Sequence, residues 1–573
     1  MRSLEYRFSK LCGRSFSGAN LLFSKDGNTV FSVVGNRVLL FDLVKGVCSA
    51  LPAQARKNIT AIATDPQGTT LIAVDEDGKA ILVSLAKRTV MTHFNFKGSV
   101  RCLKFSPDGR FLAVGIGKIV SVYKSPQLSM EFCPFHLFKS FSGPVDDILS
   151  LDWSKESKFL AVGSKDLTAR VYAIDVDAGV RLRRLTLSGH RDYVVSVGFI
   201  DDTRLVSVAR DGALFMWNIL LDEAEGIFRS EFESKHLFPK QESGNGWTQI
   251  ISADVFSSPG ATLVVAGSSS GVFTIYSLPD FEQVHSLSIS GHQISSVKMN
   301  PSGDWIAFGC PHLGQLLVWE WKSETYVLKQ QGHLFDMKCL AYSPDGSLIA
   351  TGGDDGKVKI WNASSGYCFV TFSDHTCSIS DIAFSSRGNV VFSASLDGTV
   401  RAYDLVRYRC FRTFTAPSES IVQFTSVVCD PSGDIVCAGA MDPFEVFVWS
   451  LRTGQLLDVL SGHEGPISGL AFNTNRSLLV SSSWDKSVKV WDVFSTKTAT
   501  ETLMHGSDVV AVASSPCGNF ICSSNLAGQL CFWDLATGEQ VGLIEGKKDI
   551  LGGRKRDDRR TWKNATDGLW FST

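Results

Sequence analysis

The stretch Gly332–Asn362, GHLFDMKCLAYSPDGSLIATGGDDGKVKIWN, decides the fold. With the residues that follow it, this stretch contains four short runs rich in strand-forming side chains: Met337–Tyr342, Leu348–Thr351, Val358–Trp361 and Tyr367–Phe372. Two turns, Ser343–Gly346 and Asp354–Gly356, separate the first three runs, and each contains a Gly that can take the positive φ of a tight hairpin. The stretch therefore predicts four antiparallel strands joined in order.

An aromatic residue closes the third run, and an equivalent residue recurs along the whole chain at intervals of 40 to 59 residues. The recurring residues are Phe41, Tyr123, Tyr172, Trp217, Tyr276, Trp319, Trp361, Tyr403, Trp449, Trp491 and Trp533, with Val83 in the one weak place. A repeat in the low forties with four strand signals is typical of a β-propeller blade. Because one ring closes with about four to eight blades, twelve repeats predict an all-β fold of two tandem propellers.

The repeats divide unequally between the two predicted rings. The first seven, Phe41 to Trp319, predict a seven-bladed propeller over residues 1–330, and the last five predict an incomplete second propeller over residues 331–573. The final residues, 568–573, resemble the start of a further strand, so we expect the native protein to continue beyond them. For the outer strand that completes the first ring, the sequence leaves two candidates open, Glu5–Cys12 and Tyr326–Gln330.

Composition excludes several classes of function. The 573 residues include 56 Lys and Arg against 58 Asp and Glu, a formal net charge of −2, so a nucleic acid would have to bind at a local patch. The 14 Cys have no metal-binding spacing, and we expect buried free thiols in a reducing compartment, for instance at Cys102, Cys339, Cys429 and Cys531. No signal sequence and no apolar run of ~20 residues is present, so we expect no membrane association.

The repeats resemble WD40 repeats, since four open with Gly-His, as in Gly462-His463, and two close with Trp-Asp, as in Trp491-Asp492. Four repeats contain the His, Ser or Thr, Asp and aromatic residues that the WD40 family hydrogen-bonds inside a blade. The sets are His190/Ser207/Asp211/Trp217, His333/Thr351/Asp355/Trp361, His375/Ser393/Asp397/Tyr403 and His463/Ser481/Asp485/Trp491. We expect the Asp to bond to the His, the His to the hydroxyl and the hydroxyl to the Trp ring nitrogen, which satisfies buried polar groups cooperatively.

Three residues, Tyr403, His292 and His505, depart from this pattern. Tyr403 has no ring N–H, so its set must end differently. His292 and His505 open their repeats without an Asp at the matching place, so we expect packing alone to hold those two blades.

The same residue types occur in Ser/His/Asp hydrolases, but a hydrolase needs one such set beside an oxyanion hole rather than four at fixed spacing. Gly267–Gly271, GSSSG, matches the nucleophile elbow of some hydrolases, but it joins two strand-like runs instead of a strand and a helix. No phosphate-binding loop, dinucleotide fingerprint or metal motif occurs. We therefore expect no enzyme activity, no cofactor and no small-molecule substrate.

Two segments that interrupt the period are candidate contact sites. Leu220–Gly246 is a long insertion, and we favour a partner-docking segment that orders on binding, with Phe228, Phe232 and Phe238, over a tolerated insertion. Residues 546–563, GKKDILGGRKRDDRRTWK, form a basic loop that suits contact with RNA or an acidic partner, although charge runs are often only solvated. Its candidate contacts are Lys547, Lys548, Arg554, Lys555, Arg556, Arg559, Arg560, Trp562 and Lys563.

Several local stretches resemble the periodic tryptophan protein 2 family over essentially the whole chain. They are Phe23–Gly27, Val34–Val38 and Phe41–Leu43, then Phe105–Gly109 with Phe132–Phe135, and finally Ile544–Asp549, Gly552–Lys555 and Lys563-Asn564. The resemblance implies a nucleolar protein of eukaryotes, with tandem WD40 propellers and a helical C-terminal domain that this chain lacks. It also implies membership of the UTP-B subcomplex of the small-subunit processome, a ribonucleoprotein of the nucleus that assembles on pre-rRNA and guide small nucleolar RNA.

These expectations describe a non-catalytic scaffold of ribosome biogenesis and rRNA processing. Its partners would be other WD40 subunits of that subcomplex, further processome proteins, and RNA held through backbone phosphates. Two alternatives from other classes stay open: a vesicle-coat subunit, which also places two propellers before a helical region, and a ubiquitin-ligase substrate receptor.

Overall fold

The computed structural model describes residues 12–125, 135–174, 184–222, 227–239, 242–243, 246–258, 261–417, 421–473, 478–494 and 499–545. Every regular element in these ranges is a β-strand, and the strands form antiparallel sheets whose members follow one another along the chain. The predicted all-β class is therefore confirmed. The chain divides into two compact units, residues 1–332 with 365–367, and residues 333–364 with 368–573.

The first unit contains seven four-stranded sheets among its described residues. They are β1–β4 (Leu22–Phe23, Thr29–Val34, Arg37–Asp42, Val47–Ala50), β5–β8 (Ile59–Thr64, Thr70–Asp75, Lys79–Ser84, Thr89–Asn95), β9–β12 (Val100–Phe105, Phe111–Ile116, Ile119–Lys124, His136–Ser142), β13–β16 (Ile148–Trp153, Phe159–Ser164, Thr168–Ala173, Leu185–Ser188), β17–β20 (Val194–Phe199, Arg204–Ala209, Ala213–Asp222, Ile227–Leu237), β23–β26 (Ile250–Ser257, Thr262–Ser268, Val272–Leu278, Glu282–Ser288) and β27–β30 (Ser296–Met299, Trp305–Cys310, Gln315–Glu320, Thr325–Gln331). A separate two-stranded ribbon consists of β21 (Glu242–Ser243) and β22 (Gly246–Trp247).

The second unit contains five four-stranded sheets among its described residues. They are β31–β34 (Met337–Tyr342, Leu348–Gly353, Val358–Asn362, Cys368–Phe372), β35–β38 (Ile379–Phe384, Val390–Ser395, Thr399–Asp404, Arg409–Thr415), β39–β42 (Phe424–Cys429, Ile435–Ala440, Val446–Ser450, Leu456–Leu460), β43–β46 (Ile467–Phe472, Leu478–Ser483, Ser487–Asp492, Ala499–Met504) and β47–β50 (Val509–Ser514, Phe520–Asn525, Gln529–Asp534, Gln540–Glu545).

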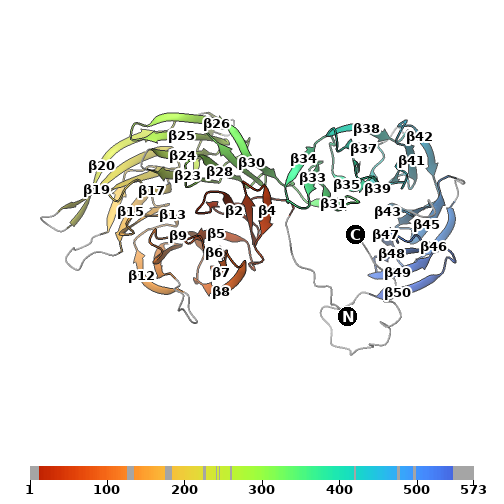
Figure 1. The fold of residues 1–573 in the computed structure, drawn as a ribbon, viewed down its shortest axis with the longest axis horizontal. Coiled ribbons are helices and arrows are strands. Elements are labelled where there is room, and N and C mark those ends of the chain that lie inside the picture. The colour runs from red at the N-terminus through yellow and green to blue at the C-terminus, as the bar shows by residue number, and fades with distance from the viewer. Residues whose placement is uncertain are drawn as a thin grey trace, which may run out of the picture. The chain divides into compact units, whose positions relative to one another are not determined.

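Within each unit the sheets are arranged radially, with the first strand of every sheet innermost and the fourth outermost (Figure 1). In the first unit the innermost strands are neighbours in the order β1, β5, β9, β13, β17, β23, β27 and again β1, which is a closed ring. In the second unit they follow one another from β31 through β35, β39 and β43 to β47.

The recurring aromatic residues lie in the third strand of each sheet and are buried between neighbouring sheets. Trp361, Trp449 and Trp491 are each 1% exposed, and Trp449 packs with Phe414 from the adjacent sheet and with Phe424 of its own sheet. A single four-stranded sheet cannot bury these rings alone, so each sheet needs a neighbour on its face. The period in the sequence is therefore a period of the hydrophobic core.

The segment before β1 joins the first and last sheets of the first unit. The N–H of Ser15 donates to the carbonyl of Gly314 in the β28–β29 turn (3.0 Å), and the N–H of Ser17 donates to the carbonyl of Val33 in β2 (3.0 Å). Between them Phe16 is fully buried in a cluster that contains residues of both sheets. These contacts close the ring, and the outer strand of the last sheet is β30, which corresponds to the candidate Tyr326–Gln330. The other candidate, Glu5–Cys12, lies outside the described residues except for Cys12.

The long insertion differs from the sequence expectation. Its described part is the longest hairpin of the first unit, β19 and β20, which pair from Ala213 opposite Leu237 to Asp222 opposite Ile227. The prediction of a segment that orders on binding is thus wrong for these residues, because the insertion extends an existing strand pair.

The four cysteines singled out from the sequence are free thiols. Cys531 is buried, whereas Cys102, Cys339 and Cys429 are half-buried at the level of the whole residue. Burial of the sulfur raises the pKa of Cys102, Cys339 and Cys429 to about 12. These side chains therefore behave as small apolar groups rather than as reactive nucleophiles.

Candidate functional site

Two of the four predicted sets form complete hydrogen-bonded chains in the second unit. His333 lies before β31, Thr351 in β32, Asp355 in the hairpin and Trp361 in β33. His333 Nδ1 is 3.0 Å from Asp355 Oδ1, His333 Nε2 is 2.8 Å from Thr351 Oγ1, and the indole N–H of Trp361 donates to that oxygen at 2.8 Å. The chain ties the entry to the sheet, the hairpin and the core aromatic residue together.

The set around His463 repeats this geometry. His463 Nδ1 is 2.7 Å from Asp485 Oδ2, and His463 Nε2 is 2.7 Å from Ser481 Oγ. The indole N–H of Trp491 donates to Ser481 Oγ at 2.8 Å. Burial alone would raise the pKa of Asp485, but hydrogen bonds from His463 and Ser487 outweigh burial, so the pKa falls below its ordinary value.

The set around His375 has the first two links and ends differently, as its sequence indicates. His375 Nδ1 is 2.8 Å from Asp397 Oδ2, and His375 Nε2 is 2.7 Å from Ser393 Oγ. Tyr403 is fully buried and stacks on Phe372, with the ring centroids 4.3 Å apart. Aromatic packing takes the place of the indole N–H.

The set around His190 lacks the Asp link that the sequence predicts. His190 Nε2 is 2.7 Å from Ser207 Oγ, and Trp217 donates to the same oxygen at 2.9 Å, but His190 Nδ1 is buried without a hydrogen-bond partner. The imidazole stacks instead on Phe215 at 4.1 Å, and Asp211 accepts the N–H of Ala213 at 3.0 Å. Burial lowers the pKa of His190 to about 4.

Two further sets escaped the sequence reasoning. His505 Nε2 is 2.7 Å from Ser523 Oγ, which accepts from Trp533 at 3.0 Å, so the expectation that packing alone holds this blade is wrong. The signal was present, because His505, Ser523 and Trp533 have the same spacing as His333, Thr351 and Trp361. Compared with the complete sets, the His505 set lacks only the Asp.

In the sheet β13–β16, an arginine pairs with the hairpin Asp, where the complete sets have a histidine. Arg170 NH1 is 2.6 Å from Asp166 Oδ2, and their side chains are only 7% and 8% exposed. Asp166 also accepts the hydroxyl of Thr168 at 2.6 Å and the N–H of Val145 at 2.9 Å. Asp166 lies six residues before Tyr172, as Asp355 does before Trp361, and this spacing could have identified it.

The hydroxyls of the predicted sets cannot reach a substrate. Ser207, Ser393 and Ser481 are 0% exposed and Thr351 is 1% exposed, and three of the four also accept an indole N–H. A nucleophile must contact its substrate, so these residues support the blades. Gly267–Gly271 is likewise the β24–β25 hairpin turn, in which Ser268 Oγ accepts the N–H of Val272 at 3.1 Å.

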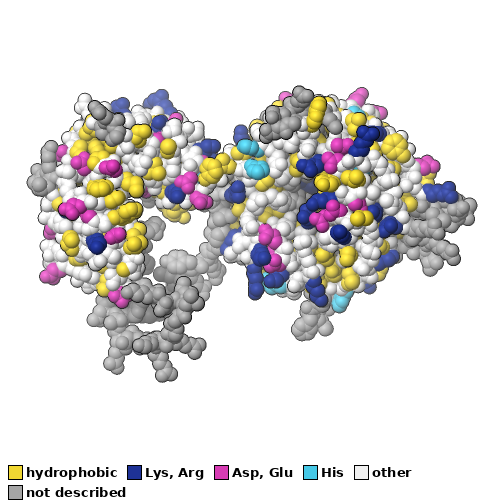
Figure 2. All heavy atoms as spheres, turned by 180° about the vertical axis from the view of Figure 1, so that it is seen from behind, with side chains coloured by type: hydrophobic (Ala, Val, Ile, Leu, Met, Phe, Trp, Pro, Cys, Tyr) yellow, Lys and Arg dark blue, Asp and Glu magenta, His cyan; other side chains and the backbone are white. Residues whose placement is uncertain are grey.

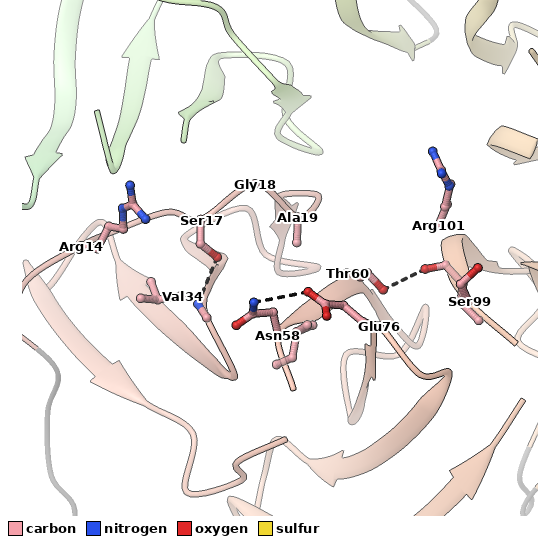
Figure 3. Close-up of a pocket in the computed structure, with 13 residues that line it drawn as sticks. Arg14, Ser17, Gly18, Ala19, Val34, Asn58, Thr60, Glu76, Ser99 and Arg101 are labelled. Carbon is pink, nitrogen blue, oxygen red and sulfur yellow. Dashed lines mark hydrogen bonds between the residues drawn. The ribbon is translucent and has the colours of Figure 1, made fainter. Parts of the chain in front are cut away.

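A cavity of about 740 Å³ opens on the first unit where the segment before β1 meets the turns around β5–β7 (Figure 3). Arg14 and Arg101 extend from opposite sides of it, with Glu76 and Asn58 between them (Figure 3). Asn58 donates to Glu76 at 3.3 Å, and Thr60 donates to the carbonyl of Val100 at 2.8 Å. Much of the polar lining is thus engaged within the first unit, and both signs of charge are present.

The face of the first unit in Figure 2 is hollowed near its centre, with basic and acidic side chains around the hollow. Ion pairs between innermost strands join β9 to β13 through Lys104 and Asp152, and β23 to β27 through Asp254 and Lys298. Asp152 and Asp254 also accept N–H groups of the next innermost strand, Phe199 at 2.7 Å and Met299 at 2.9 Å. These carboxylates connect neighbouring sheets.

The predicted contact residues differ in how far they are exposed to solvent. Phe232 lies on β20, is 53% exposed and packs edge-on against Phe215 and Trp217. Phe238 is only 5% exposed and packs on Tyr276, so the expectation that it contacts a partner is wrong. The side chain of Phe228 lies outside the described residues, as does the whole basic loop 546–563.

Groups of three or more His, Cys, Asp or Glu side chains that could hold a metal ion are absent from the part of the chain that the structure describes. Within the same part, no helix has the length and apolar character needed to cross a membrane.

The repeats match known family models. The model "WD domain, G-beta repeat" matches residues 87–123, 135–173 and 182–218, and the model "IFT122 first beta-propeller" matches residues 293–561. Periodic tryptophan protein 2 of Arabidopsis thaliana is 41% identical over 100% of this chain and 70% of its own length. The chain belongs to the periodic tryptophan protein 2 family.

Other curated family members agree. The Mus musculus homologue is 45% identical over 99% of this chain and 66% of its own length, and the Schizosaccharomyces pombe homologue is 47% identical over 99% and 67%. The chain thus spans about two thirds of the length of these relatives. Membership of the periodic tryptophan protein 2 family supports the interpretation that this chain is a WD40 protein of ribosome biogenesis.

Proposed function

We propose that this chain is part of a non-catalytic scaffold of the nucleolar small-subunit processome, within the UTP-B subcomplex, and that it serves small-subunit rRNA processing. The single observation that carries the proposal is the family relationship, which extends over 99% or more of the chain at 41–47% identity to the plant, mouse and fission-yeast proteins. A WD40 fold alone would support only an interaction module, because fold does not determine function.

The architecture suits a scaffold physically. Each unit is a set of sheets that pack face to face, and in several sheets a buried hydrogen bond such as His333–Asp355 anchors a hairpin turn to the segment that enters the sheet. A rigid surface loses little conformational entropy on binding. Several weak contacts on linked units would add through avidity, so the chain would bind several processome proteins and other WD40 subunits at once.

RNA would be held through its phosphates. Residues 546–563 contain eight Lys or Arg and only three Asp, together with Trp562. Such a segment attracts pre-rRNA or small nucleolar RNA without reading base sequence, and its affinity falls as salt rises. The proposal assigns RNA contact to this basic loop and a structural role to the buried His, Ser and Asp sets.

Charge reversal tests the RNA contact. Replacing Arg554, Lys555, Arg556, Arg559 and Arg560 with Glu should reduce ultraviolet crosslinking of the tagged protein to pre-rRNA several-fold, while the melting profile stays unchanged. A matched variant that reverses five exposed cations of the first unit, Lys25, Lys45, Lys87, Lys118 and Arg191, controls for net charge and should crosslink normally. Equal crosslinking by both variants would remove the RNA role of the loop.

A further inference from the structure

One face of the second unit is defined by a repeated backbone contact. In each of its five described sheets, the residue after the second strand donates its N–H to a carbonyl in the connection that enters the same sheet, at 2.8–3.1 Å. The five donors are Asp354, Leu396, Met441, Trp484 and Leu526. Because this bond places the hairpin beside the connection, all five residues lie at the same end of their sheets. We name this end of the second unit the hairpin face.

The first unit makes the same bond with different residue types. Four of its hairpins donate in this way at 2.8–3.1 Å, through Glu76, Lys165, Arg210 and Ser269. All four are polar or charged, whereas four of the five in the second unit are large and apolar. Since the bond uses only the backbone N–H, the fold does not require an apolar side chain at this position.

Several apolar side chains of the hairpin face are open to solvent. Met441 is 36% exposed, Trp484 51% and Leu526 73%. Two more residues, in the connections at the same end of the sheets, are Phe335 at 62% and Ile421 at 74%. A single exposed apolar residue is ordinary, but several on one face at repeated positions indicate an interaction site. Trp in particular is enriched among the residues that dominate binding energy.

The charges on this face favour a basic partner. The connections carry three exposed acids, Asp336, Asp374 and Glu464, and the β40–β41 hairpin adds a fourth, Asp442. Lys338 and Lys486 are exposed on the same side, but Lys338 lies 3.4 Å from Asp354, which offsets its charge. Acidic groups beside exposed apolar anchors repel phosphates and attract Lys and Arg, so charge complementarity favours a protein over RNA.

We propose that the hairpin face of the second unit binds a segment of another protein in which Leu, Ile, Phe or Met anchors stand among Lys and Arg residues. The apolar anchors pack on Met441, Trp484 and Leu526, and the acids steer the basic residues and set the register. This inference deepens the scaffold proposal by naming a docking surface and the chemistry of its partner, and it assigns protein contact to the second unit.

The test selects displayed random linear peptides against the whole protein. We expect the enriched peptides to combine aliphatic or aromatic residues with Lys and Arg. The triple variant Met441→Ser, Trp484→Ser, Leu526→Ser should bind such a peptide at least about tenfold more weakly in fluorescence anisotropy. Folding is expected to persist, because Ser269 makes the same backbone bond in the first unit.

A matched control removes exposed apolar residues at the opposite end of the sheets. Val406 (74% exposed) and Phe494 (61% exposed) follow third strands, and Val406→Ser with Phe494→Ser should leave peptide affinity unchanged. Asp442→Asn with Glu464→Gln should weaken binding and reduce its dependence on salt. Single-stranded RNA should not compete.

Four outcomes would overturn the inference: no enrichment, enrichment of acidic peptides, equal binding by the triple and control variants, or competition by RNA. Each of them leaves the association of the chain with pre-ribosomal particles untouched, so failure here is distinguishable from failure of the proposed function.

Discussion

The hydrogen bonds through Asp355 should contribute measurably to the stability of the second unit. An equivalent Asp in the first unit provides the control. In Asp355→Ala, His333 Nδ1 loses its acceptor at 3.0 Å while its side chain stays 2% exposed. Stranding a buried donor costs about 1–3 kcal/mol. The N–H groups of Leu334 and Lys357 also lose the carboxylate, but these backbone groups lie in partly exposed turns that water can reach.

The control is Asp211→Ala. Asp211 occupies the equivalent hairpin position in the first unit, but His190 Nδ1 has no hydrogen-bond partner, so this substitution loses only the bond from the Ala213 N–H. We expect a cost of at most about 1 kcal/mol. Asp355→Asn keeps an acceptor for His333 and should fall between wild type and Asp355→Ala.

Because the protein has two units, a single unfolding free energy is not defined for the whole chain. Hydrogen–deuterium exchange of peptides covering β31–β33 reports the local effect, and calorimetry should show one transition lowered by roughly 2–4 °C per kcal/mol. Faster exchange confined to the second unit in Asp355→Ala would support the hydrogen-bonded chain. Equal effects of Asp355→Ala and Asp211→Ala would refute the reasoning.

Three further predictions concern single groups. Burial raises the pKa of Asp381 to about 6, so the folded state favours the protonated form and the ionised carboxylate lowers stability above that pH. Asp381→Asn keeps an acceptor for the Val427 N–H. This variant should have a higher melting temperature than wild type at pH 7.5, and the difference should disappear at pH 4.5. The pH dependence from His190 has the opposite sign. Burial lowers the pKa of His190 to about 4, so the stability contributed by its neutral form is present above pH ~6.5 and is lost as pH falls toward 4. His190→Gln should therefore flatten the stability of the first unit between these pH values. Ser523→Ala removes the acceptor of the Trp533 indole and the partner of the His505 imidazole. It should cost about 1–3 kcal/mol in the denaturant transition of the second unit, whereas packing alone would make it neutral.

Much of the fold could be predicted from the sequence, because the repeat follows from the packing that every sheet requires. Each sheet must bury an aromatic residue such as Trp361 against its neighbour, and each hairpin needs turn residues at fixed offsets from it. The same offsets identified the complete sets around His333 and His463. They failed at His190, where stacking on Phe215 replaces the carboxylate. Such a contact depends on a neighbouring strand, which spacing alone does not reveal.

The surfaces were harder to predict. Phe238 resembled a docking residue in an irregular insertion, yet the extended pairing of β19 and β20 carries the chain back into the core before it. The hairpin face was invisible in the sequence, because Met441, Trp484 and Leu526 are more than forty residues apart and only the shared backbone bond shows that they occupy equivalent places. A surface of this kind becomes recognisable when one unit can be compared with the other.

The central claim, that this chain belongs to a pre-ribosomal scaffold, has one direct test. The tagged protein, expressed at its natural level, is purified and its bound RNA and proteins are identified by sequencing and mass spectrometry. We predict pre-rRNA and small nucleolar RNA together with several other WD40 subunits, in a nucleolar particle. Recovery with vesicle-coat or ubiquitin-ligase subunits, and without pre-rRNA, would contradict the claim.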